Sequence, residues 1–112
     1  MSDIVRASES EDGQTVEVQA GSTLELQLQE NPTNGYRWTL SPPPECLSLV
    51  DDTFTPPAAL VPGRPGSHTW QFLAVGPGTG TLQLVSARSW EPTPGRHYTL
   101  RIVVPTDRPV NR

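Results

Sequence analysis

Few residues of this chain could carry covalent or acid–base chemistry. There is one cysteine, Cys46, and there are two histidines, His68 and His97. Cys46 follows three prolines and has no cationic neighbour or helix N-terminus to activate its thiol, so we expect it to be a packing residue. Each histidine begins an expected strand, where an exposed side chain is the simpler interpretation and a general base the alternative. No recognised catalytic motif accompanies them, so the sequence predicts no enzyme.

The same inventory offers little to a metal or to a nucleic acid. One cysteine and two histidines without zinc-type spacing predict neither a metal site nor another cofactor, and a lone cysteine cannot form an internal disulfide. The formal net charge is -4, and all eight basic residues are arginines that form no cluster. Because binding to a phosphate backbone needs several cations on one face, nucleic acid is not an expected partner.

The first segment with a distinctive composition is Asn-Pro-Thr-Asn-Gly-Tyr at residues 31–36. Pro32 fixes its own φ, and Asn34-Gly35 is the dipeptide that best tolerates a positive φ. A plain turn is the simpler interpretation, but the segment is richer in proline, threonine and asparagine than a turn requires. We therefore predict a loop whose backbone shape is fixed before it meets a partner.

Two later segments are also candidates for contact with a partner. Residues 61–67 mix glycine and proline with one arginine, Arg64, and could be either a linker or bare backbone laid against a partner. Residues 88–96 begin with Arg88 and hold Trp90 beyond the alternating part of a strand. Such a tryptophan is either a lid over the end of the core or a contact anchor. We favour the anchor, because Trp and Arg dominate binding hot spots.

Strands must position these segments. The 13 prolines and 9 glycines of the chain leave no room for a helical bundle. Apolar and polar residues instead alternate with period two in several places. A turn at 20–22 joins its neighbouring strands either as a hairpin or at a sheet corner, and the polar, proline-rich stretch 51–67 is expected to be a surface loop. The expected strands are 14–19, 23–29, 36–40, 47–50, 69–75, 81–87 and 97–104, with a possible edge strand at 4–8.

Seven to eight short strands without a helical crossover predict an all-β protein, an immunoglobulin-like antiparallel β-sandwich without a disulfide. A small barrel is the alternative. The length fits a single domain over residues 1–112, with a frayed tail at 105–112. No apolar run is long enough to cross a bilayer, and residues 1–13 hold no apolar leader segment, so we expect no membrane contact. A cytoplasmic location follows, or a periplasmic or secreted one if a leader has been removed.

The three segments together resemble the pattern of the chagasin-type inhibitors of papain-like cysteine peptidases. That pattern is N-P-T-T-G-[YF], then a glycine-rich segment, then R-P-W. This chain has N-P-T-N-G-Y at 31–36, G-R-P-G at 63–66 and R-S-W at 88–90. The order and spacing match over nearly the whole chain. The departures are Asn34 for the second threonine, Pro65 among the glycines, and Ser89 in place of proline.

The resemblance implies a reversible, competitive inhibitor, monomeric when free, whose partner is a papain-like cysteine peptidase. The loop around Thr33 would cover the catalytic Cys–His pair of the enzyme, and Trp90 would pack on its primed side with support from Arg88. A protein-binding or assembly module without peptidase inhibition is the alternative. The residues implied in peptidase binding are Asn31, Pro32, Thr33, Asn34, Gly35, Tyr36, Gly63, Arg64, Pro65, Gly66, Arg88, Ser89 and Trp90.

Overall fold

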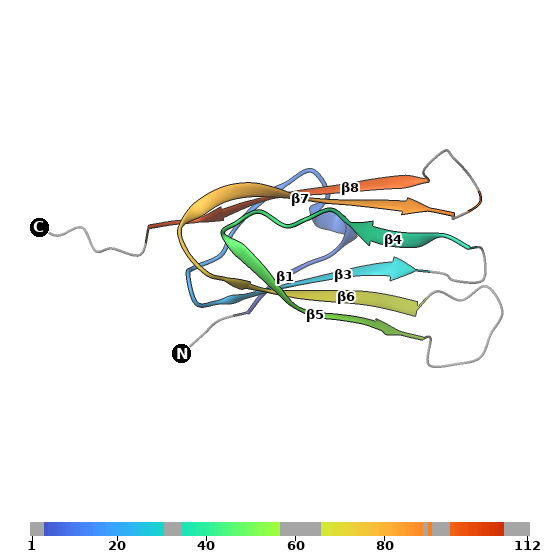
Figure 1. The fold of residues 1–112 in the computed structure, drawn as a ribbon, viewed down its shortest axis with the longest axis horizontal. Coiled ribbons are helices and arrows are strands. Elements are labelled where there is room, and N and C mark those ends of the chain that lie inside the picture. Colours follow the sequence, from blue (N-terminus) through green and yellow to red (C-terminus); the bar gives the residue numbers. More distant parts are fainter. Residues whose placement is uncertain (1–3, 31–34, 57–65, 89, 91–94, 107–112) are drawn as a thin grey trace, which may run out of the picture.

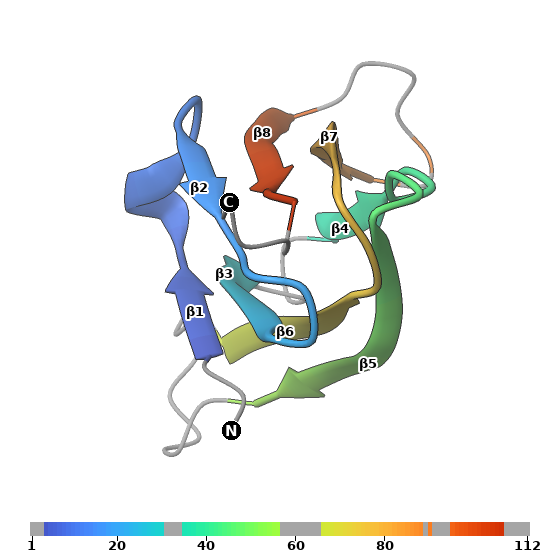
Figure 2. The same cartoon turned by 90° about the vertical axis from the view of Figure 1, so that its left-hand side faces the viewer.

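The computed structural model describes residues 4–30, 35–56, 66–88, 90 and 95–106. They form two four-stranded sheets packed face to face, which Figure 1 shows from the side and Figure 2 from one end. The first sheet has the order β1-β3-β6-β5, from strands Ile4–Ala7, Thr23–Glu30, Gly66–Ala74 and Leu47–Thr55. The second has the order β2-β8-β7-β4, from Thr15–Glu17, Arg96–Val104, Gly78–Ala87 and Arg37–Leu40. A short 3-10 helix, η1 (Glu9–Glu11), links β1 to β2.

The β-sandwich predicted from the sequence is confirmed, with one difference in strand direction. Each sheet carries a parallel strand at one edge: β1 runs parallel to β3, and β2 runs parallel to β8. The remaining pairs are antiparallel. The turn at 20–22 joins β2 of the second sheet to β3 of the first, so it is a sheet corner and not a hairpin. Gly21 fixes this corner, since its N–H donates to the carbonyl of Ala74 at 2.8 Å.

The prediction of a surface loop over 51–67 is wrong at both ends, because strands occupy part of that range. β5 continues to Thr55, and β6 already begins at Gly66. β5 is an edge strand whose side chains are exposed at most positions, so the apolar alternation that marks a half-buried strand is missing after Leu47. A register shift between Leu49 and Asp51 disturbs the pattern further. Backbone pairing with β6 therefore maintains β5, although its side-chain pattern does not predict a strand. Residues 57–65 lie outside the described part of the chain.

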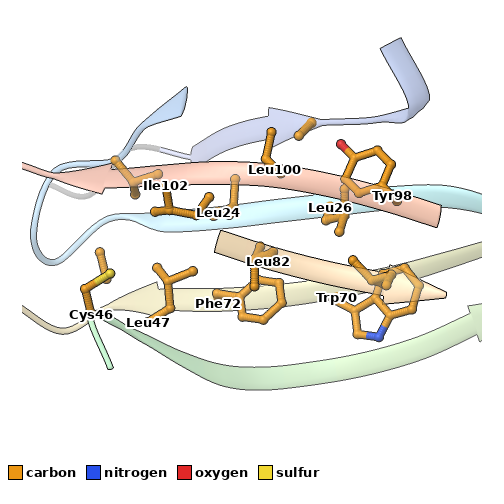
Figure 3. Packing of buried hydrophobic residues seen from close by; sticks show 14 of the residues in the cluster. Leu24, Leu26, Cys46, Leu47, Trp70, Phe72, Leu82, Tyr98, Leu100 and Ile102 are labelled. Carbon is orange, nitrogen blue, oxygen red and sulfur yellow. The ribbon is translucent and has the colours of Figure 1, made fainter. Parts of the chain in front are cut away.

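The core lies between the sheets, where the alternating residues of β3, β6, β7 and β8 meet (Figure 3). Trp70 and Phe72 are its largest fully buried side chains. Cys46 is free and 6% exposed beside Leu47, which confirms its interpretation as a packing residue. Burial of this apolar surface is the main stabilising contribution in a domain without a disulfide. Among the described residues, no helix has the length and apolar character needed to span a membrane. The end of the expected tail, residues 107–112, is outside the described part of the chain.

The segment around η1 holds the end of β3. The carboxylate of Glu9 accepts the backbone N–H of Gln29. This part of β3 lies beyond its pairing with β1, which ends at Leu26. The hydroxyl of Tyr98 on β8 donates to the carbonyl of Ser8 at 2.7 Å. Burial raises the pKa of that hydroxyl well above its usual range, and the carboxylates around η1, led by that of Glu11, add to the rise. The hydroxyl therefore stays protonated and keeps η1 attached to the sandwich.

Candidate functional site

Three loops leave the sandwich at one end, which we call the loop end. Figure 1 shows β3, β5 and β7 ending there and β4, β6 and β8 beginning there. The first loop joins β3 to β4, the second joins β5 to β6, and the third joins β7 to β8. Of the residues predicted for the site, the structure describes Gly35, Tyr36, Gly66, Arg88 and Trp90. The others lie outside the described residues: Asn31, Pro32, Thr33, Asn34, Gly63, Arg64, Pro65 and Ser89.

The first and third loops touch at Gly35 and Trp90. Gly35 has a φ of 83°, as the sequence predicted. A Cβ atom at this position would overlap the six-membered ring of Trp90 at Cη2 and lie 3.0 Å from Cζ2. Glycine is therefore required twice, for its backbone conformation and for the space above it. Trp90 is 68% exposed, so it is not a lid over the core.

Arg88 links the same two loops through aromatic faces. Its guanidinium carbon lies 4.3 Å from the ring centroid of Tyr36 and 5.8 Å from that of Trp90, both within cation–π range. The ring of Tyr36 packs in turn on Gly95, where a Cβ atom would lie 2.7 Å from Cε1. Arginine is well suited to this position, because its planar guanidinium stacks on aromatic rings. Gly35, Tyr36, Arg88 and Trp90 thus form one packed unit, which we call the aromatic cluster.

The second loop returns to the sandwich at Gly66. This residue is buried and is paired with Glu30 at the end of β3. A Cβ atom here would overlap the carbonyl oxygen of Thr55 and lie 2.7 Å from Cζ of Phe54. Only glycine lets the backbone approach β5 so closely at the base of this loop. The first and second loops therefore leave from neighbouring strand ends.

Beneath the loops lies a group of polar residues whose contacts the sequence analysis did not predict. Glu30 is 6% exposed. One of its carboxylate oxygens accepts the backbone N–H of Trp38 at 2.8 Å, and the other lies 2.7 Å from Nδ1 of His68. Nε2 of His68 contacts a carboxylate oxygen of Asp52. We call Glu30, Asp52 and His68 the carboxylate–histidine network. The indole N–H of Trp38 donates to the carbonyl of Gln29 at 2.9 Å, so β4 is also fastened to the end of β3.

The network corrects one expectation about the histidines. His68 is the third residue of β6 and its side chain is 14% exposed, so it is not an exposed strand-end residue. His97 is exposed, as expected. The sequence did contain a signal: the inward positions of β3 are Leu24, Leu26 and Leu28, and Glu30 continues that phase. A carboxylate on a buried phase needs a partner. In the part of the chain that the structure describes, no group of three or more His, Cys, Asp or Glu side chains is placed so that it could hold a metal ion.

Comparison with known proteins places the chain in a family. The family model for chagasin family peptidase inhibitors (I42) matches residues 17–102. The chain belongs to this family. It is 31% identical over 102 residues to amoebiasin-2 of Entamoeba histolytica, covering 87% of this chain and 82% of that protein. It is 28% identical over 90 residues to chagasin of Trypanosoma cruzi, covering 76% of this chain and 82% of that protein.

Solved structures agree with this assignment. The crystal structure of a cysteine protease inhibitor from Entamoeba histolytica aligns with a TM-score of 0.76 and 29% identity, over 90% of this chain and 94% of that one. Members of the chagasin family are inhibitors and not enzymes, which confirms the absence of catalytic function predicted for this chain. The family assignment also confirms the resemblance that the three sequence motifs indicated.

Proposed function

We propose that this chain acts, as a single domain, as a reversible and competitive inhibitor of papain-like cysteine peptidases. The observation that carries the proposal is the aromatic cluster, which joins the first and third loops at the same end of the sandwich as the second. Its exposed Trp90 and its glycine-dependent backbone at Gly35 are the features expected of a preformed contact surface. Family membership supports the class of target, since a structural relative is a cysteine protease inhibitor.

In the proposed mechanism the first loop blocks the enzyme by its shape. The backbone around Thr33 covers the catalytic Cys–His pair through main-chain hydrogen bonds, and no peptide bond is presented in the geometry that nucleophilic attack requires. We expect Pro32 to restrict that backbone, because its ring fixes φ, and Asn31 and Asn34 belong to the same proposed contact. Loops held on a rigid sandwich lose little conformational entropy on binding, so more of the contact energy is retained as affinity.

The other two loops enlarge the contact on either side. Residues 63–66 run along the unprimed side of the cleft as extended backbone. Trp90 packs against an aromatic wall on the primed side. Because its side chain has only two torsions, it loses little conformational entropy on binding. Arg88, which stacks on Tyr36 and Trp90, either supports this loop or pairs with an acidic residue at the rim of the cleft. Ser89 completes the third loop.

The test is hydrolysis of a small fluorogenic peptide by papain, followed at several inhibitor and substrate concentrations. A competitive inhibitor raises the apparent KM and leaves kcat unchanged, and activity returns on dilution because no covalent bond forms. Cys46→Ala is the matched control for covalent chemistry: its thiol is buried, so the variant should inhibit as well as the wild-type chain.

Two outcomes would contradict the proposal. Absence of inhibition at micromolar concentrations, with native circular dichroism, would favour an assembly module instead. Loss of inhibition in a folded Cys46→Ala variant would contradict the non-covalent mechanism. We also propose that the free protein is a monomer and that it forms a 1:1 complex with the peptidase, which size-exclusion chromatography with light scattering measures directly.

A further inference from the structure

The carboxylate–histidine network plays no part in the mechanism above, yet it lies at the base of the loops. Its imidazole stands between two carboxylates, with Glu30 of β3 at Nδ1 and Asp52 of β5 at Nε2. The rest of the ring contacts uncharged groups. It stacks on Trp70 of β6 with centroids 4.0 Å apart and planes at 6°, and it meets the ring of Phe54 of β5 at 6.4 Å and 72°.

This geometry favours a charged imidazole. Each ring nitrogen of His68 faces a carboxylate oxygen, which can only accept a hydrogen bond while it is ionised. A neutral imidazole has one N–H, so one of its nitrogens would direct a lone pair at a carboxylate. The imidazolium donates from both nitrogens and also supplies the positive charge that the buried Glu30 needs. Stacking on Trp70 adds cation–π attraction to the same charged form.

The network also has a particular place in the chain. Glu30 directly precedes the first loop, and its second oxygen accepts the N–H of Trp38, just beyond that loop. His68 lies two residues after Gly66, where the second loop ends, and Asp52 lies on the strand that leads into the second loop. One cation therefore joins the strand ends from which the first and second loops emerge.

We propose that His68, in its imidazolium form, is a positioning residue that holds the first and second loops in the geometry that binds the peptidase. This inference rests on the proposed function. The network is complete while His68 carries its positive charge. Without that charge Glu30 is a buried carboxylate that lacks a counter-charge, the strand ends loosen, and inhibition weakens.

The experiment compares four proteins on papain under one set of conditions: wild type, His68→Gln, the double variant Glu30→Gln/His68→Gln, and His97→Gln. Each variant's inhibition constant is divided by that of the wild type. His97 is the matched control, since it is the second histidine of the chain and is exposed. Circular dichroism establishes that each variant is folded.

For His68→Gln we expect a ratio of about ten, because only part of the penalty for an unpaired buried charge reaches the loops. The double variant should restore most of the inhibition, since a neutral amide at position 30 needs no counter-charge and can still accept the N–H of Trp38. His97→Gln should stay near one.

A second measurement requires no peptidase and remains informative if His68→Gln fails to fold. In the free wild-type protein, at the pH of the assay, the ¹⁵N NMR signals of His68 should show a proton on both ring nitrogens, because each nitrogen faces a carboxylate oxygen. A ratio for His68→Gln close to one, a double variant that restores no inhibition, or a neutral His68 ring would overturn the proposal. Wild-type protein that fails to inhibit, while both ring nitrogens of His68 carry a proton, would instead contradict the proposed function.

Discussion

Gly35 combines two demands that only glycine meets, a φ of 83° and the ring of Trp90 where a side chain would begin. We expect Gly35→Val to weaken inhibition by about a hundredfold, since the branched side chain both disfavours the backbone conformation and displaces an anchor residue. The measurement is the inhibition constant on papain.

Gly21→Val is the control for backbone strain. Gly21 has a φ of 89° and lies at the sheet corner, away from the loop end. Apart from its two chain neighbours, no heavy atom lies within 4 Å of the position that a Cβ would take. We expect a similar loss of folding stability in both variants but unchanged inhibition for Gly21→Val. Equal inhibition constants for wild type and Gly35→Val would show that the first loop does not depend on its shape.

Trp90 should behave as a contact residue and not as a core residue. Because it is 68% exposed, Trp90→Ala removes little buried surface and should change the free energy of unfolding by about 1 kcal/mol or less. Binding should weaken by about 2–4 kcal/mol, the range for an aromatic anchor. Urea denaturation and inhibition measured on the same preparation separate the two effects. A large loss of stability with normal inhibition would contradict the assignment.

At the scale of elements, side-chain alternation predicted the strands that have one face in the core. β3 and β8 bury every second residue, and both were found from that period. The second half of β5 was missed because an edge strand with two exposed faces has no such period. The parallel edges were missed too, since the pairing of β1 with β3 and of β2 with β8 depends on which sheet each short strand joins, and four residues such as Ile4–Ala7 carry no signal for that.

The site was predictable in its order along the chain but not in its contacts. Proline, glycine and tryptophan types identified the three loops. The packing of Trp90 on Gly35 joins residues far apart in sequence, and the ring contacts of Arg88 depend on how two loops meet. The contact of Glu30 with His68 spans 38 positions. Period-two alternation places Glu30 on a buried face, but it does not say which strand brings the counter-charge.

The short helix η1 gives a prediction about acid. The backbone N–H of Ser8 donates to the Glu11 carboxylate at 2.7 Å, and this bond, followed by that from the Ser10 hydroxyl, lowers the pKa of Glu11 below its usual value. A depressed folded-state pKa stabilises the fold above the unfolded-state value, and this contribution is lost as pH falls through the folded-state value. We expect Glu11→Gln to remove this part of the acid dependence. NMR titration of the Glu11 carboxyl checks the direction, and a value at or above that of a denatured reference would contradict it.

For the whole molecule, stability and binding are located in different places. The two sheets bury their apolar residues along the length of the sandwich (Figure 3). The aromatic cluster and the carboxylate–histidine network lie at its loop end. A sandwich that is folded but less stable should therefore present the same loops. Since native domains are stable by about 5–15 kcal/mol, one core substitution can lower stability and still leave nearly all molecules folded.

Ile102→Ala tests this separation. Ile102 is fully buried and lies six residues into β8, about 20 Å along the strand from its start at the loop end. The cavity should lower the free energy of unfolding by about 2–5 kcal/mol. The inhibition constant should stay within about twofold of wild type, because the variant removes no contact at the loops and the folded fraction stays close to one. Urea denaturation followed by tryptophan fluorescence gives the first quantity, and papain titration gives the second. A folded Ile102→Ala protein that inhibits tenfold less well would show that the core and the loop end are coupled. The geometry of the loops would then depend on the packing of the entire sandwich and not on the contacts at their own bases.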